Sequence, residues 1–130
     1  MTQHVPTEIK LHQKSRKLEI SFDTGETFEL SCEFLRVFSP SAEVRGHGPG
    51  QETLQTGKKE VNIMHIEAVG SYGIKPFFSD GHKSGIFDWD TLYRMGRLKD
   101  ELWQEYLQKL EEAGQSREPV VASETLGKKL

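Results

Sequence analysis

Five histidines and one cysteine give this sequence its widest range of possible chemistry. The histidines are spread along the chain, at His4, His12, His47, His65 and His82. No two of them have the spacing of a helical His-x3-His pair or of a Cys/His finger, the arrangements that bring metal donors together within one short segment. Donors to a metal would have to converge from distant segments, so we expect surface or turn positions for these side chains.

Cys32 has two interpretations. A neighbouring histidine could lower its pKa and make the thiolate a nucleophile. However, Cys32 continues the alternation of Phe28 and Leu30, and a cysteine in such a pattern packs as a small apolar side chain. The pattern favours burial, and it leaves an enzyme that uses Cys32 or His47 as the weaker alternative.

A glycine-rich segment, Gly-His-Gly-Pro-Gly-Gln at residues 46–51, has the look of a phosphate-binding loop. It lacks the G-x4-G-K-[ST] frame that such a loop requires. We interpret it as a shaped loop that presents His47 and Gln51. The surrounding stretch, residues 41–59, carries no regular pattern, and loops of this length inside a compact domain are often functional.

Alternating apolar residues predict antiparallel strands in the N-terminal part of the chain. These strands are expected at residues 9–11, 18–22 and 28–32, with the last two forming a hairpin. Ser31 has the side chain of a helix N-cap. We expect it to begin a short helix over residues 32–38, which Pro40 ends.

A second set of strands is followed by a helical pattern. The strands are expected from residue 61 to about residue 70, at 72–78 and at 86–89, and the last two form a second hairpin. Pro76 cannot donate to a ladder and should lie at an edge or a bulge. From Asp90 the period becomes that of an amphipathic helix, kinked or split at Gly96, capped by Asp88 or Asp90 and ended by Gly114. The predicted fold class is α+β, with small antiparallel β-hairpin sheets, one short helix and a long C-terminal helix.

Composition limits the organisation and the classes of partner. The 130 residues are enough for one domain, which we expect at 8–112, between a flexible N-terminus (1–7) and a disordered tail (113–130). A net charge of −3 gives no basic face for nucleic acid, and no apolar run is long enough to span a membrane. A single cysteine is typical of the reducing cytoplasm.

Two segments together resemble a known family. One reads FLRVFSPSAEVRGHGPGQ at residues 34–51, and the other reads YGIKPFFSDGHKSGIFDW at residues 72–89. Over about residues 8–100 the chain resembles the γ-butyrobetaine hydroxylase-like N-terminal domain family in its short, stand-alone bacterial form. The resemblance implies a domain that in other proteins precedes an iron- and 2-oxoglutarate-dependent catalytic domain or is fused to an iron–sulfur carrier ATPase.

The resemblance also implies what became of a structural zinc site. In the hydroxylases three cysteines, just after a Leu-Arg pair that corresponds to Leu35 and Arg36, hold zinc with a histidine of a later Asp-Gly-His turn. The cysteine positions fall here on Ser39, Ser41 and Val44, and only the histidine is kept, as His82. Hydroxyls and an isopropyl group cannot replace thiolates around Zn²⁺, so we expect no zinc of that kind and no resident cofactor.

We therefore expect a non-catalytic interaction module rather than an enzyme, because the catalytic domain of the related hydroxylases is not in the sequence. The partner would be an unidentified protein, with iron–sulfur or 2-oxoglutarate oxygenase-related proteins as the class that the resemblance implies. Its contacts are expected at Arg36, His47, Gln51 and His82. The alternative is a domain that binds a small ligand or a metal (zinc or iron) through His47 and His82. A purely structural role of His82, as a partner of backbone carbonyls near its turn, is favoured over that alternative.

Overall fold

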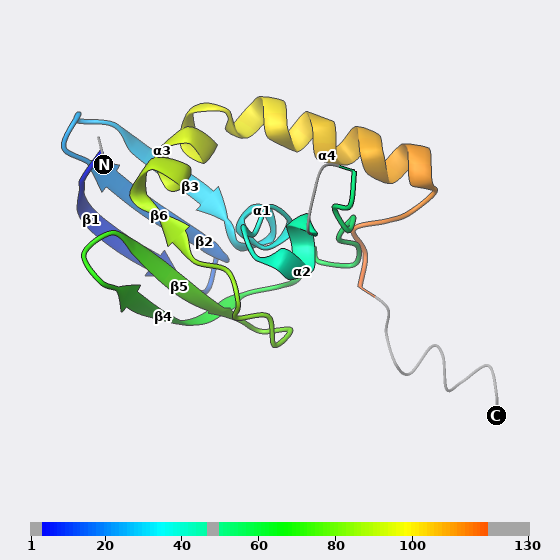
Figure 1. The fold of residues 1–130 in the computed structure, drawn as a ribbon, viewed down its shortest axis with the longest axis horizontal. Coiled ribbons are helices and arrows are strands. Elements are labelled where there is room, and N and C mark those ends of the chain that lie inside the picture. Colours follow the sequence, from blue (N-terminus) through cyan, green and yellow to red (C-terminus); the bar gives the residue numbers. More distant parts are fainter. Residues whose placement is uncertain (1–3, 47–49, 120–130) are drawn as a thin grey trace.

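A computed structural model of the chain describes residues 4–46 and 50–119. Its described residues form two three-stranded antiparallel sheets, with orders β1-β2-β3 and β4-β5-β6, and four helices. The sheets lie together at one end of the molecule and the longest helix, α4, extends toward the other (Figure 1). The predicted α+β class is confirmed.

The first sheet follows the predicted alternation. Its strands are β1 (Pro6–His12), β2 (Lys17–Phe22) and β3 (Thr27–Ser31). Leu18 faces Leu30 and Ile20 faces Phe28 across the β2–β3 hairpin. Because side chains alternate between the faces of a strand, Leu18 and Ile20 are fully buried, while Lys17, Glu19 and Ser21 are partly exposed.

Helix α1 (Cys32–Val37) begins where the sequence predicts. The Ser31 hydroxyl caps it by accepting a hydrogen bond from the Phe34 amide at 3.0 Å. A second helix, α2 (Ala42–Arg45), is one turn long and lies in the stretch that the sequence pattern assigned to a loop. Its turn depends on contacts with the rest of the domain, since four residues are too few for a stable helix by themselves.

The second sheet contains β4 (Ile63–Val69), β5 (Gly73–Phe78) and β6 (Phe87–Asp88). Strand β6 pairs only with Gly73 and Ile74 of β5. Further along β5, Pro76 pairs with Ile66 of β4, and no described strand borders its other side. Pro76 therefore has the edge position that its missing N–H requires.

The C-terminal helical pattern is divided into α3 (Trp89–Arg97) and α4 (Lys99–Ala113). Asp88 caps α3 by accepting from the Thr91 amide at 2.7 Å. The division falls at Leu98 and not at Gly96, which lies inside α3. Gly96 packs closely on Phe28, because an added Cβ would lie 2.4 Å from the ring of that residue. Gly114 ends α4 in the left-handed conformation, with φ 64°, as predicted.

Both sheets, α1 and α3 contribute to one core. Its fully buried large side chains include Phe22, Leu30, Phe34, Leu35, Ile63, Phe87 and Leu92. A smaller apolar cluster, formed by Val37, Tyr106 and Leu110, packs the C-terminal half of α4 onto α1. Within the described part of the chain, no helix is long and apolar enough to cross a membrane.

The packed part of the chain is wider than the expected 8–112. At the N-terminal side, the His4 ring stacks on Tyr93 with 3.7 Å between centroids. At the C-terminal side, Gly57 and Lys59 donate backbone hydrogen bonds to the carbonyls of Ser116 and Arg117. The segments expected as a flexible N-terminus and a disordered tail are thus docked where the structure describes them; residues 1–3 and 120–130 lie outside the described residues.

Candidate functional site

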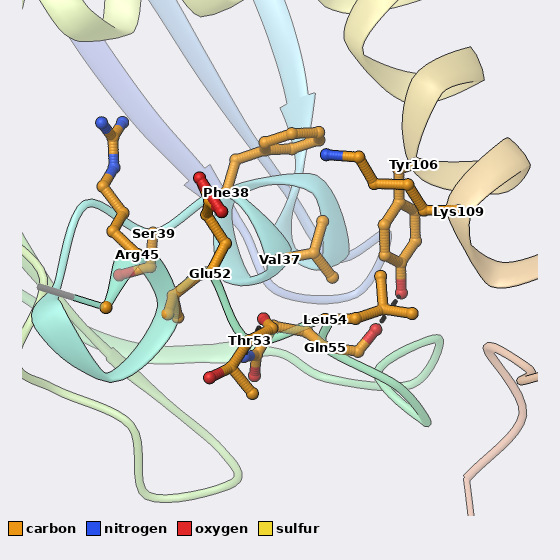
Figure 2. Close-up of a pocket in the computed structure, with 12 residues that line it drawn as sticks. Val37, Phe38, Ser39, Arg45, Glu52, Thr53, Leu54, Gln55, Tyr106 and Lys109 are labelled. Atoms are coloured by element: carbon orange, nitrogen blue, oxygen red, sulfur yellow. Dashed lines mark hydrogen bonds between the residues drawn. The ribbon is translucent and has the colours of Figure 1, made fainter. Parts of the chain in front are cut away.

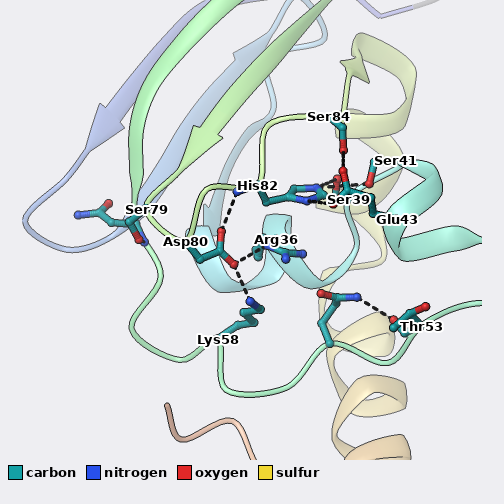
Figure 3. A network of polar contacts seen from close by, with 12 residues as sticks. Arg36, Ser39, Ser41, Glu43, Thr53, Lys58, Ser79, Asp80, His82 and Ser84 are labelled. Carbon is teal, nitrogen blue, oxygen red and sulfur yellow. Dashed lines mark hydrogen bonds and ion pairs between the residues drawn. The ribbon is translucent and has the colours of Figure 1, made fainter. Parts of the chain in front are cut away.

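The first candidate site is built around His82, in the turn between β5 and β6. Its Nε2 lies 2.9 Å from the Ser39 hydroxyl oxygen and 3.4 Å from that of Ser41 (Figure 3). The turn is closed locally, because the Phe78 amide donates to the His82 carbonyl and Gly81 adopts a φ of 90°. His82, Ser39 and Ser41 are all buried.

Asp80, two residues before His82, fastens this turn to α1. Its carboxylate accepts from Arg36 Nε at 2.8 Å and from Lys58 Nζ at 2.6 Å, and it also accepts from the His82 amide. Burial opposes its ionisation, but Lys58, the His82 amide and Arg36 together hold the pKa of Asp80 below its ordinary value. We call Arg36, Ser39, Ser41, Asp80 and His82 the imidazole cluster.

His82 is held neutral in this environment. Burial first, and then the nearby Arg36 cation, lower its pKa below the ordinary 6.5. Its Nδ1 lies 3.6 Å from a carboxylate oxygen of Glu43, beyond ordinary hydrogen-bond length, and Glu43 instead accepts from the Ser84 hydroxyl at 2.6 Å. A neutral imidazole suits a role as hydrogen-bond partner of the two serines.

The order of a Ser–His–acid triad is present in Ser39, His82 and Glu43. A substrate, however, cannot reach the serine hydroxyl. Ser39 has no exposed surface, and its hydroxyl packs so closely on Gly85 that a Cβ at that glycine would lie 2.1 Å from it. An acyl donor has to reach the nucleophile within about 3–3.5 Å. The sealed hydroxyl therefore holds the turn and is not placed for nucleophilic attack.

The residues at the zinc positions of the resembled family do gather, but they do not fit the metal. Ser39 and Ser41 meet His82, while Val44 is buried and offers no donor. Neutral hydroxyls are poor ligands for Zn²⁺, whose closed sites use thiolate and imidazole. Among residues 4–46 and 50–119, no three His, Cys, Asp or Glu side chains group as a metal site would need.

The predicted contact residues are only partly brought together. Arg36 and His82 meet through Asp80, whereas Gln51 is exposed and forms no part of the imidazole cluster. His47 lies outside the described residues. The sequence predicts backbone carbonyls as the partners of His82, but in the structure its partners are serine hydroxyls. The reason is that Ser39 and Ser41, in the segment between α1 and α2, pack against the imidazole.

Cys32 is packed as the alternation predicts. It has no exposed surface, and its sulfur lies 3.7 Å from the side-chain oxygen of Asn62. Burial raises the pKa of the thiol, which keeps it protonated and unreactive.

The second candidate site is an open groove of about 710 Å³ beside the imidazole cluster. It lies between the end of α1, the short α2, the segment 52–55 and α4 (Figure 2). Its lining residues are Val37, Phe38, Ser39, Val44, Arg45, Gly46, Glu52, Thr53, Leu54, Gln55, Tyr106 and Lys109. The volume is within the range of about 300–1,000 Å³ that is typical of ligand pockets.

Hydrogen bonds hold the groove wall formed by residues 52–55. The Thr53 amide donates to the Val44 carbonyl at 2.8 Å, and the Tyr106 hydroxyl donates to the Gln55 carbonyl at 2.7 Å. Burial raises the pKa of Tyr106 to about 12, so the phenol keeps the proton that it donates. The wall is therefore tied to both α2 and α4.

Residues 115–118, which we call the C-terminal strap, hold residues 57–59, which continue the chain beyond this wall. Arg117 binds the buried carboxylate of Glu33 through Nε and Nη2, both at 2.7 Å, and its guanidinium lies 5.1 Å from the centre of the Trp103 ring. The strap also accepts the two backbone hydrogen bonds from Gly57 and Lys59. Charge and stacking together fasten the strap against α1 and α4.

The sequence patterns did not identify the groove. Arg45 and Lys109 are far apart in the chain, and an arginine and a lysine on helices are ordinary surface residues. One local signal was available: Leu54 is an apolar residue inside a polar, glycine-containing stretch. Such a residue suggests that the loop packs on the domain rather than projecting from it.

Comparison with known proteins finds relatives of the same fold. The family model described as "Gamma-butyrobetaine hydroxylase-like, N-terminal" matches residues 9–93. Two NMR solution structures are similar: one is 44% identical, with 93% of this chain and 95% of that chain covered at a TM-score of 0.79, and the other is 50% identical, with 93% of each covered at a TM-score of 0.77.

A crystal structure of a protein of unknown function from Acidithiobacillus ferrooxidans, a member of the DUF971 family, is 36% identical to this chain. The alignment covers 70% of this chain and 91% of that chain, at a TM-score of 0.60. Among curated proteins the comparison finds no match.

Proposed function

This chain belongs to the gamma-butyrobetaine hydroxylase-like N-terminal family, and on that premise we propose that it is a non-catalytic binding module whose groove receives a partner protein. The observation that supports this proposal is the groove itself. It combines ligand-sized volume, an apolar floor and two exposed cations, Arg45 and Lys109, in one open surface.

The distribution of reactive groups supports a binding role over a catalytic one. Cys32 and Ser39 are sealed in the core, and His82 is almost as deeply buried. The groove is lined by apolar, cationic and hydrogen-bonding side chains, and its one carboxylate, Glu52, has no described titratable partner. General acid–base catalysis needs a positioned proton donor or acceptor with a pKa near the working pH. The Tyr106 phenol in the groove does not meet this need, because burial raises its pKa to about 12 and its proton is donated to the Gln55 carbonyl.

We place the partner among iron–sulfur proteins or 2-oxoglutarate oxygenase-related proteins in the cytoplasm. The support is the resemblance described above, in which domains of this kind stand beside catalytic or iron–sulfur carrier domains in longer chains. We propose that this domain makes the same kind of contact with its partner. In the cytoplasm the single cysteine would stay reduced.

Site-directed photo-crosslinking in the native host tests the groove and the partner class together. A photoreactive benzoylphenylalanine replaces Thr53 in the groove wall, and the matched control carries it at Thr7, an exposed threonine of β1. We expect an adduct with one protein at position 53 and none at position 7. Equal adducts at both positions, or none, would remove the groove as the binding site; an adduct with a protein of another class would remove only the accessory role.

A variant that fills the groove gives the complementary test. Thr53→Trp adds an indole to the wall, whereas Thr7→Trp adds the same group on the distant sheet. We expect Thr53→Trp to abolish co-purification of the crosslinked partner and Thr7→Trp to leave it intact. Two-dimensional NMR spectra of both variants verify that the fold is unchanged.

A further inference from the structure

We infer that the groove recognises a short apolar peptide segment of the partner that carries an acidic side chain, which the exposed cations of the lining, Arg45 and Lys109, attract. This inference rests on the proposed function, because it names the chemistry of what enters the groove. Three features of the groove carry it.

The first feature is the apolar floor. Val37 and Val44 are buried, and Phe38 and Leu54 are partly buried around them, with Tyr106 closing the floor on the α4 side (Figure 2). The polar atom of Tyr106 is already used by the Gln55 carbonyl. The floor thus offers hydrophobic contact, which drives association through the area that it removes from water.

The second feature is the pair of cations. The side chains of Arg45, on α2, and Lys109, on α4, are exposed and form no ion pair or hydrogen bond with the residues that the structure describes. Other described cations nearby are engaged: Arg36 and Lys58 bind Asp80, and Arg117 binds Glu33. Arg45 and Lys109 are therefore available to a carboxylate from outside.

The third feature is the balance of charge. Among the described residues, the groove lining carries two cations and one carboxylate, Glu52, which accepts from the Gly50 amide at 3.4 Å. The lining is therefore net cationic, although the whole chain has a net charge of −3. A partner segment with one acidic side chain complements this lining, and a basic segment would meet two like charges.

Affinity for capped peptides tests the inference on the intact chain. The probes are acetylated and amidated hexapeptides of apolar residues with one central glutamate, matched with sets in which this residue is glutamine or lysine. We expect the glutamate set to bind about fivefold more tightly than the glutamine set, as one charge-assisted contact allows. Amide shifts of Arg45, Thr53, Leu54 and Lys109 should report the binding.

Charge-removing variants assign the effect to the two cations. Arg45→Gln and Lys109→Gln should each reduce the preference for glutamate over glutamine, and the double variant should abolish it. Lys14→Gln, in the turn between β1 and β2, removes the same charge outside the groove and should change nothing. All three positions are exposed, so the variants are expected to fold.

Several outcomes would overturn the inference. Equal binding of the glutamate and glutamine sets would show that the groove does not recognise a carboxylate. Tightest binding of the lysine set would show that the groove prefers a positive charge. If glutamine peptides bind only when their C-termini are uncapped, the groove recognises a C-terminal carboxylate and not an acidic side chain. Octanoate that binds as tightly as the peptides would make the groove a site for small acids. If the peptides show no preference while the crosslink at position 53 is observed, only this inference fails. If neither the preference nor the crosslink is observed, the proposed function fails as well.

Discussion

The imidazole cluster and the groove lie side by side around the turn from α1 to α2, yet they use polar side chains in opposite ways. In the cluster, Ser39 and His82 are buried and bind one another. In the groove, Arg45 and Lys109 are exposed and have no partner among the described residues. The difference shows that the residue types with the richest chemistry are used to fasten the fold, while ordinary surface cations are the groups left available for binding.

The largest effect is expected in the cluster, from His82→Ala. The change removes a buried imidazole and leaves the hydroxyls of Ser39 and Ser41 without their shared partner. We expect the free energy of unfolding to fall by about 3 kcal/mol, the sum of a cavity and unsatisfied polar groups. Urea denaturation measures it. His65→Ala, at an exposed position of β4, is the control and should cost less than about 0.5 kcal/mol.

A somewhat smaller loss is expected when the strap is released by Arg117→Ala. The Glu33 carboxylate, only 6% exposed, would lose both of its hydrogen bonds to the guanidinium. We expect a loss of about 2 kcal/mol, less than for a fully buried pair because Arg117 is partly solvated. Hydrogen exchange should also speed up at the Gly57 and Lys59 amides, which the strap holds. An unchanged exchange rate at these amides would mean that the wall does not depend on the strap.

The two serines of the cluster should differ from each other. Ser39 lies 2.9 Å from His82 Nε2 and Ser41 lies 3.4 Å from it, so the shorter hydrogen bond should contribute more. We expect Ser39→Ala to cost about 1–1.5 kcal/mol in unfolding free energy and Ser41→Ala about 0.5 kcal/mol. Equal losses would show that the two hydroxyls share the imidazole equally.

A modest pH dependence should also originate in the cluster. The pKa of His82 is lower in the folded chain than its ordinary value of 6.5, so below that pH the unfolded chain binds a proton that the folded chain resists. The free energy of unfolding should therefore decrease as the pH falls from 7 to about 5.5. The His82→Gln variant, which cannot titrate, should lose this component. A parallel decrease in wild type and variant would assign the pH dependence to other groups.

Much of the fold was accessible from the sequence because it depends on local signals. The alternation around Leu18 and Ile20 predicted the first hairpin, and the side chains of Ser31 and Asp88 marked the starts of α1 and α3. Gly114 marked the end of α4. Each of these signals acts within a few residues, and local geometry decides the outcome.

The remaining features depend on contacts between distant segments. Glu33 and Arg117 are 84 positions apart, and Gln55 and Tyr106 are 51 apart. No periodicity records such contacts, so the strap was predicted as tail and the wall of the groove as an unstructured loop. The resemblance to a family with a zinc site indicated that Ser39, Ser41 and Val44 lie near His82. Only the distances in the structure show that the two serines bind the imidazole.

The strap has a consequence for any protein built from this domain and another. The strap lies beside residues 57–59 and near the groove, whereas β1 begins at the far end of the molecule (Figure 1). A domain joined after residue 119 would start next to the groove and so at high effective concentration relative to it. One joined before β1 would have to reach around both sheets. The order of domains in a fusion would therefore decide whether the groove is occupied by a domain of the same chain or by a separate protein.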